Sequence, residues 1–285
     1  MNPAASKDAG PYSPERPARV LALMPHPDDF EFNVGGMFAL LRQRHGEAVV
    51  LKVMTTTTGA TGHHVLDAEQ TRARRYDEAT KAAARIGAEF SFLTRADGTT
   101  FDRQFLVEEA SLAALWNAIR SFRADLVIAP PPVSDPVAGV HIDHENTAQA
   151  VRLVAYQLGV PRAYPGDPAP DYRPPLIVLA DDTYASEAAF DLRLDISALY
   201  PTKLAMAKEH RSQIYEWLPF IDQSAPPTEA EYEVRFRARH ERVNARYGFA
   251  DAPPCEYFRI SRWGRAPREG EIAWFFGDAL KNDSF

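Results

Sequence analysis

The sequence predicts an α/β fold, a mostly parallel, doubly wound sheet with a C-terminal elaboration. Two observations lead to this prediction. Short apolar runs recur along the chain, as expected for strands that are buried on both faces. Longer stretches in which apolar residues repeat with the helical period lie between these runs. The two kinds of segment alternate from residue 19 to about residue 158, which is the order of a sheet with helices on both sides.

The first half of the chain supplies four strand–helix pairs. We expect strands at residues 19–25, 48–58, 89–93 and 125–132. Helices are expected at residues 37–46, 66–87, 105–124 and after His144. The helix at 66–87 has one stripe of apolar side chains at the spacing that packs on a sheet, namely Ala79, Ala82, Ala83 and Ile86. This order of elements is that of a Rossmann-like sheet.

The second half of the chain is less regular. Strands are expected at 175–182, 190–197 and 255–263, and helices at 201–218 and 230–248. Residues 159–175 are rich in Pro and Gly, and we expect them to form a rim or flap over the site. We divide the chain into a disordered tail (1–18) and a single domain (19–285). Within that domain, a core (19–215) precedes an elaboration (216–285) that covers one end of the sheet.

Composition excludes several classes of protein. The 285 residues are 45% hydrophobic and 25% charged, so the chain is neither globally disordered nor collagen-like. The one cysteine, Cys255, cannot form an intrachain disulfide. A net charge of −7 gives no basic footprint, and we expect no nucleic-acid partner.

Location is inferred from two absences. No run of 18 apolar residues exists, so we expect no transmembrane segment, and the first residues contain no apolar core of a secretory signal. We therefore expect a cytoplasmic protein. A cysteine-poor secreted protein would have the same cysteine count.

Two polar clusters follow predicted strands. His26-Pro27-Asp28-Asp29 comes directly after the first strand, and His141-Ile142-Asp143-His144 follows the fourth. Ligands of open parallel sheets lie beyond the carboxyl ends of the strands, so both clusters are expected at one edge. Imidazole and carboxylate ligands suit zinc and related divalent transition metals. The alternative is structural: each aspartate could cap a helix, and each histidine could simply be exposed.

These residues resemble the PIG-L/LmbE-like zinc de-N-acetylases. The resemblance rests on HPDD after the first strand, the Gly-Gly pair at 35–36 and the later His-x-Asp-His. Weaker matches extend it over roughly residues 19–215, namely Arg75-x-x-Glu78, Asp97-Gly98, Asp195-x-Ser197, Lys203 and His210-x-Ser212-Gln213. One departure is Ala60, because the family often has Glu after the preceding Thr-x-Gly.

The resemblance implies a division of roles among the clustered residues. His26, Asp29 and His144 would bind Zn²⁺ or another divalent transition metal. Asp28 would be the general base and His141 the electrophilic or acid partner. A metal lowers the pKa of bound water from ~15.7 towards ~7, which fits amide hydrolysis. Asp143 could hold the His141 ring in its charged form, or it could cap the following helix.

Three more residues are candidate substrate contacts by the same resemblance. Arg75 fits a contact to a sugar hydroxyl or phosphate; the alternative is an Arg75–Glu78 pair on one helix face. Asp97 follows the third strand. His210 could reach the site from its own or a neighbouring subunit, or it could lie on a helix surface.

The function that we expect is metal-dependent removal of an N-acyl group, normally acetyl, from an amino-sugar derivative. The partner would be a small N-acylated molecule, a glucosamine derivative by resemblance, and the chain could form a homo-oligomer, as its relatives often do. Two alternatives stay open. The enzyme could be an amidase that acts on a non-sugar amide, or the chain could be an inactive sugar- or nucleotide-binding module.

Overall fold

The chain forms one eight-stranded sheet in the order β3-β2-β1-β4-β5-β7-β6-β8 within the part that the structure describes. The structure, a computed structural model, describes residues 12–133, 139–166, 171–182, 184 and 189–281. The expected α/β class is confirmed. Strands β1 to β5 run parallel, while β7 is antiparallel to both β5 and β6.

Strands β1 to β7 lie close to the expected ranges, whereas β8 was not predicted from the sequence. The strands are β1 (Ala18–Met24), β2 (Val49–Thr55), β3 (Glu89–Phe92), β4 (Leu126–Ala129), β5 (Leu176–Ala180), β6 (Leu192–Asp195), β7 (Cys255–Ile260) and β8 (Leu280–Lys281). The helices are α1 (Asp29–Asn33), α2 (Gly35–His45), α3 (Ala68–Ala84), α4 (Glu109–Phe122), α5 (Ile142–Gln157), α6 (Tyr200–Ala207), α7 (Leu218–Ile221), α8 (Glu229–Arg246) and α9 (Glu271–Phe276).

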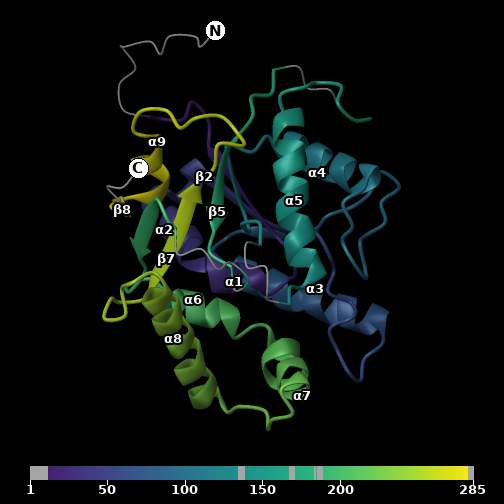
Figure 1. Cartoon of the computed structure of the whole chain (residues 1–285), viewed down its shortest axis with the longest axis vertical. Coiled ribbons are helices and arrows are strands. Elements are labelled where there is room, and N and C mark those ends of the chain that lie inside the picture. The colour runs from purple at the N-terminus through teal and green to yellow at the C-terminus, as the bar shows by residue number, and fades with distance from the viewer. Residues whose placement is uncertain (1–11, 134–138, 167–170, 183, 185–188, 282–285) are drawn as a thin grey trace.

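Helices cover both faces of the sheet (Figure 1). The apolar core on one face includes Phe38 of α2, Ala82 of α3 and Phe275 of α9. The core on the other face includes Trp116 of α4 and Val154 of α5. Leu21 and Val20 of β1 point to opposite cores, which explains why this strand is apolar without alternation.

The strand order reverses at β1, which lies between β2 and β4. Such a switch point opens a crevice beyond the carboxyl ends of the strands. Both polar clusters follow the two strands that meet there, because His26 comes after β1 and His141 after β4. The topology therefore brings the clusters together, as expected.

The segment 216–285 does more than cover one end of the sheet. Its strand β7 lies between β5 and β6, so it takes part in the sheet itself. Helix α8 packs beside α6 through a separate cluster of Tyr200, Tyr232 and Phe236 (Figure 1).

The expected helix at 201–218 is interrupted. Helix α6 ends at Ala207, and a π-helical turn, η2 (Gln213–Trp217), leads into α7. Between them, the Ser212 backbone N–H donates to the Glu78 carboxylate at 2.8 Å. The Ser212 N–H thus bonds to a side chain of α3 and not to a carbonyl of its own helix. The local sequence does not reveal this contact.

Residues 12–17 differ from the free tail that the sequence predicted. The Tyr12 ring packs edge-on against Trp274 at 5.7 Å between centroids, and Arg16 donates to Asp125. Residues 1–11 of the expected tail lie outside the described residues.

The flap expected over the site at 159–175 is described at 159–166 and 171–175. These residues lead from the end of α5 to the start of β5, and Asp171 pairs with Arg123 at the end of α4, so they lie at the edge of the sheet opposite the two polar clusters. For the described residues, the expected position over the site is therefore wrong.

Three charged side chains, which we call the clamp, hold the junction of α1 and α2: the buried Lys203 and Glu256 and the partly buried Arg239. Glu256 accepts from the backbone N–H groups of Gly36 and Met37, at 2.7 and 2.8 Å. Lys203 donates to Glu256 at 2.7 Å, and Arg239 donates to the Phe32 carbonyl at 3.2 Å. A Cβ at Gly36 would lie 2.6 Å from Ile196, so only glycine permits this approach.

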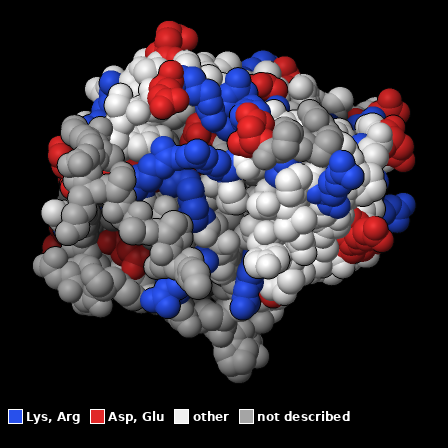
Figure 2. Space-filling model, turned by 90° about the horizontal axis from the view of Figure 1, so that it is seen from above, with Lys and Arg blue, Asp and Glu red and all other residues white. Residues whose placement is uncertain are grey.

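Charges of both signs are mixed on the surface seen in Figure 2, where Lys and Arg form a band with Asp and Glu beside it. Among the described helices, none has the length and apolar character that crossing a membrane requires.

Candidate metal centre

The turn after β1 is shaped by its own polar groups. The His26 backbone N–H donates to Asp29 Oδ2 at 2.8 Å, and the Asp29 N–H donates back to the His26 carbonyl at 3.3 Å. The polar turn expected here contains the short helix α1, which begins at Asp29. These bonds place both side chains on the same side of the turn.

Three candidate ligand atoms converge at the switch point. His26 Nδ1 lies 3.2 Å from Asp29 Oδ2, and His144 Nε2 lies 3.4 Å from the same oxygen. The ligand atoms of these three residues all lie within 4.8 Å of one another. Two imidazoles and one carboxylate are the protein donor set of a catalytic zinc site, in which water or substrate takes the fourth position. The predicted ligand set is thus brought together.

A second carboxylate holds the far nitrogen of each histidine. Asp143 Oδ2 lies 3.0 Å from His26 Nε2, and Asp182 Oδ2 lies 2.9 Å from His144 Nδ1. Metal-binding histidines normally have such a partner, because it fixes the tautomer and the ring orientation. We call His26, Asp29, Asp143, His144 and Asp182 the metal cluster.

Asp182 was not predicted from the sequence as a residue of the site. It follows β5, which is the neighbour of β4 in the sheet. A carboxylate at the end of a parallel strand was therefore a usable signal.

The metal cluster attracts positive charge. Burial alone would lower the pKa of His26, but its hydrogen bonds to Asp143 and Asp29 outweigh burial and raise this pKa to about 9. Burial is likewise outweighed at His144, whose pKa is raised by Asp29 and Asp182. For Asp29, burial opposes ionisation, yet the two histidines lower its pKa. A proton or a metal ion can supply the charge that these groups favour.

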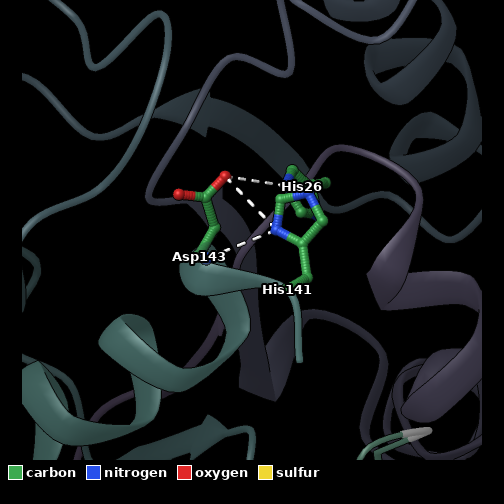
Figure 3. A group of neighbouring side chains, drawn as sticks. All are labelled: His26, His141 and Asp143. Carbon is green, nitrogen blue, oxygen red and sulfur yellow. Dashed lines mark hydrogen bonds and ion pairs between the residues drawn. The ribbon is translucent and has the colours of Figure 1, made fainter. Parts of the chain in front are cut away.

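His141 and Asp143 lie at the start of α5, next to His26 (Figure 3). His141, and not Asp143, is the N-cap: its Nδ1 accepts the Asp143 backbone N–H at 3.3 Å. An accepting Nδ1 carries no proton, so Nε2 carries the N–H. Burial and the nearby His26 lower the pKa of His141. These contacts favour a neutral ring, in contrast to the charged ring that we expected.

Asp143 contacts His26 more closely than His141. Its Oδ2 is 3.7 Å from His141 Nδ1, and its other oxygen accepts the Phe105 backbone N–H at 2.7 Å. Asp143 is buried, whereas the His141 side chain is 48% exposed. His141 is therefore open to a ligand, and Asp143 orients His26.

Asp28 lies beside the metal cluster and forms an ion pair with Arg75. The buried Arg75 guanidinium also donates to the Gly59 carbonyl at 3.2 Å. Gly59 has a φ of +63°, and a Cβ there would lie 2.1 Å from Arg75 Nη1. The alternative considered for Arg75, a pair with Glu78 on the same helix face, is absent from the described contacts of either residue. Arg75 therefore holds Asp28, and its contact with a sugar hydroxyl or phosphate stays a prediction.

His210 is buried and belongs to the same chain as the site. Its Nε2 lies 3.0 Å from Glu31 Oε2, and both side chains are 2% exposed. Burial raises the pKa of Glu31 despite its histidine partner. A role in substrate contact is not supported by this geometry, because the pair lies below the surface. Glu31, in the first turn after HPDD, was not identified from the sequence.

Asp97 does not join the site in the described contacts. It is exposed, and it accepts from the N–H and hydroxyl of Thr99 at 2.9 and 2.7 Å. These bonds form a tight turn at residues 97–99, and the expected substrate contact of Asp97 stays a prediction.

Comparisons with known proteins agree with the geometry. Residues 21–155 match the family model PIG-L, described as GlcNAc-PI de-N-acetylase. The chain carries a PIG-L domain. The comparison with curated proteins gave no significant match.

The fold is shared with several solved structures. N,N'-diacetylchitobiose deacetylase from Pyrococcus horikoshii is 21% identical, with 86% of this chain and 84% of that chain covered and a TM-score of 0.65. GalB from Pseudomonas putida, a 4-carboxy-2-hydroxymuconate hydratase, is 17% identical over 88% and 99% of the two chains, with a TM-score of 0.60. A deacetylase of teicoplanin biosynthesis is 15% identical over 85% and 96%, with a TM-score of 0.54.

The PIG-L domain contains both polar clusters, from His26 to His144. Asp182, His210 and the clamp lie outside it. Because a hydratase shares the fold, the reaction has to be argued from the site and not from the fold.

Proposed function

We propose that the protein is a metal-dependent hydrolase that removes an N-acetyl group from an amino-sugar derivative. The observation that carries this proposal is the convergence of His26, Asp29 and His144, with Asp28 beside them and unused as a ligand. The family description and the deacetylases among the similar folds support the same chemistry.

The residues fit a divalent ion. His26 Nδ1, Asp29 Oδ2 and His144 Nε2 would hold it, and Asp143 and Asp182 would orient the two imidazoles. Two nitrogens and one oxygen favour zinc over harder cations such as Mg²⁺. When bound, the ion would act as a Lewis acid that activates water and polarises the acyl oxygen.

Asp28 would move the proton. Asp28 directly precedes Asp29 in the turn, and the buried Arg75 pairs with its carboxylate. Asp28 would accept a proton from the attacking water and deliver it to the amine that leaves. His141, exposed at the start of α5, would donate its Nε2–H to the acyl oxygen as negative charge develops there.

The test is acetate release by zinc-loaded protein from a panel of N-acetylated sugars and simple non-sugar amides. We expect turnover of the sugars, and we expect Asp28→Asn to lower kcat by ~10²–10⁴-fold with metal content unchanged. The matched control is Asp77→Asn, an exposed aspartate of α3 that pairs with Lys81, which should retain full activity. Acetate release from the non-sugar amides alone would contradict the substrate class. Normal turnover by metal-loaded Asp28→Asn would contradict the mechanism.

A further inference from the structure

We propose that an apolar rim beside the metal cluster binds an apolar group attached to the sugar, such as an alkyl or aryl aglycone. The rim consists of His64, Val65, Trp217, Leu218, Phe220 and Ile221. This inference rests on the proposed deacetylase function and specifies which amino-sugar derivatives the same site would accept.

The rim presents large apolar side chains to solvent. Val65 is 75% exposed, and Phe220 and Ile221 of α7 are 52% and 54% exposed. Leu218 on the same short helix is also exposed. A surface on which several such side chains gather is typical of a site for a ligand or a partner.

Aromatic rings form a stacked row within the rim. His64 stacks on Phe220 with 4.2 Å between centroids and 7° between planes. His63 continues the row beyond His64, and Trp217 continues it beyond Phe220, at 5.0 and 5.9 Å. The row offers a flat apolar surface whose side chains have few rotatable bonds. These side chains would therefore lose little conformational entropy when a ligand covers them.

A chain of contacts connects the rim to Asp28. His63 Nε2 lies 2.9 Å from Glu216 Oε2 in the π-helical turn, and Gln213 of that turn donates to the Gly62 carbonyl at 3.1 Å. A Cβ at Gly62 would lie 3.0 Å from Arg75, the residue that holds Asp28. The rim and the Asp28 carboxylate are thus linked through Gly62 and Arg75, and we call this run of contacts the wall. A substrate with its amide at Asp28 can therefore extend towards the rim.

The charges of the wall are already neutralised. Glu216 pairs with His63 and with Arg74, which donates to it at 2.8 Å. The rim itself contains no carboxylate, ammonium or guanidinium group. This chemistry favours an apolar ligand over a phosphate or a second charged sugar, because burying a charge there would leave it without a partner.

The experiment compares N-acetylglucosamine with its octyl glycoside, below the concentration at which the glycoside forms micelles. We expect Phe220→Ser/Ile221→Ser to lower kcat/KM for the octyl glycoside by about 10- to 100-fold, through KM, and to leave the free sugar unchanged. The matched control is Tyr156→Ser/Val234→Ser, which removes two exposed apolar side chains from α5 and α8. An equal effect on both substrates, or no effect, would overturn the proposal.

Binding of octyl glucoside, measured by calorimetry, separates this proposal from the proposed function. Suppose that no sugar is deacetylated, but that the wild type and the control variant bind octyl glucoside and the rim variant does not. The proposed function would then be wrong, and the rim would still be a binding site for an apolar group. Two results would assign another occupant and overturn the inference. In one, the wild type is a dimer in sedimentation and the rim variant a monomer; in the other, the wild type pellets with phosphatidylcholine vesicles and the rim variant does not.

Discussion

The metal cluster and the clamp are both buried groups of charged side chains, but they balance their charge in opposite ways. In the clamp, Lys203 donates to Glu256, and the three side chains also bond to backbone groups and to the Asn33 side chain at the α1–α2 junction. In the metal cluster, three carboxylates surround two imidazoles, and the pKa of His26 is raised to about 9. The clamp is complete without a ligand, whereas the metal cluster favours an additional positive charge.

This difference separates structural from functional charge. A buried pair that satisfies itself contributes mainly to the shape of the fold. A buried cluster with excess carboxylate binds protons or a cation. The two groups lie at opposite ends of α1, because Asp29 begins this helix and the clamp bonds to Phe32 near its end. Variants can therefore show which group determines metal affinity and which determines the free energy of unfolding.

The largest effect is expected for His144→Ala. Without His144 Nε2, only His26 and Asp29 remain as ligands, so zinc should be lost and activity with it. Elemental analysis of purified protein and acetate release measure both. Full zinc occupancy in this variant would show that the ligand assignment is wrong.

The next effect is expected in the clamp. Lys203→Met leaves Glu256 buried without its ammonium partner, which should lower the free energy of unfolding by about 3–5 kcal/mol. Urea denaturation of the zinc-free protein measures it. The zinc affinity of the folded protein should not change. A large loss of zinc affinity with normal stability would mean that the clamp belongs to the site.

Asp182→Asn should act on metal binding alone. Removing the carboxylate partner of His144 Nδ1 should weaken zinc binding by ~10–100-fold. Competition with a chromogenic chelator measures this affinity. Asp181→Asn is an unsuitable control, because Asp181 pairs with Arg246; Asp195→Asn, in an exposed turn, serves instead. Equal affinities in Asp182→Asn and wild type would remove Asp182 from the metal cluster.

The smallest effect is the dependence of metal affinity on pH. Since the pKa of His26 is about 9 without metal, this ring is protonated at neutral pH and must lose its proton to bind zinc. The His144 ring, whose pKa is also raised, must lose its proton as well, so zinc affinity should rise with pH by at least about tenfold per unit up to the pKa of His26. Chelator competition at several pH values tests the sign. An affinity that falls as pH rises would contradict a shared proton and metal site.

The sequence predicted the parts that depend on local pattern. Apolar runs located the strands, and polar residues at strand ends located the ligands, because parallel strands end at one edge. Arg75 shows where this reasoning stops. Its contact with Asp28 depends on a close approach by Gly59, and no pattern along the chain connects these three residues.

Other misses have the same cause. Glu31 and His210 lie in different parts of the chain, and each reads as an ordinary helical side chain. The break after α6 depends on Glu78, a residue of α3. The position of β7 between β5 and β6 is a property of strand order, which alternation of strands and helices does not determine.

The position of β7 has a consequence for synthesis of the chain on the ribosome. All five members of the metal cluster have been translated by Asp182, but β7 begins only at Cys255. Until then β5 has an open edge, and β6 lacks the strand that joins it to the sheet. Open edges of this kind invite pairing with other nascent chains. Ribosome-associated chaperones that shield the β5 edge would therefore matter most during translation of residues 183–255.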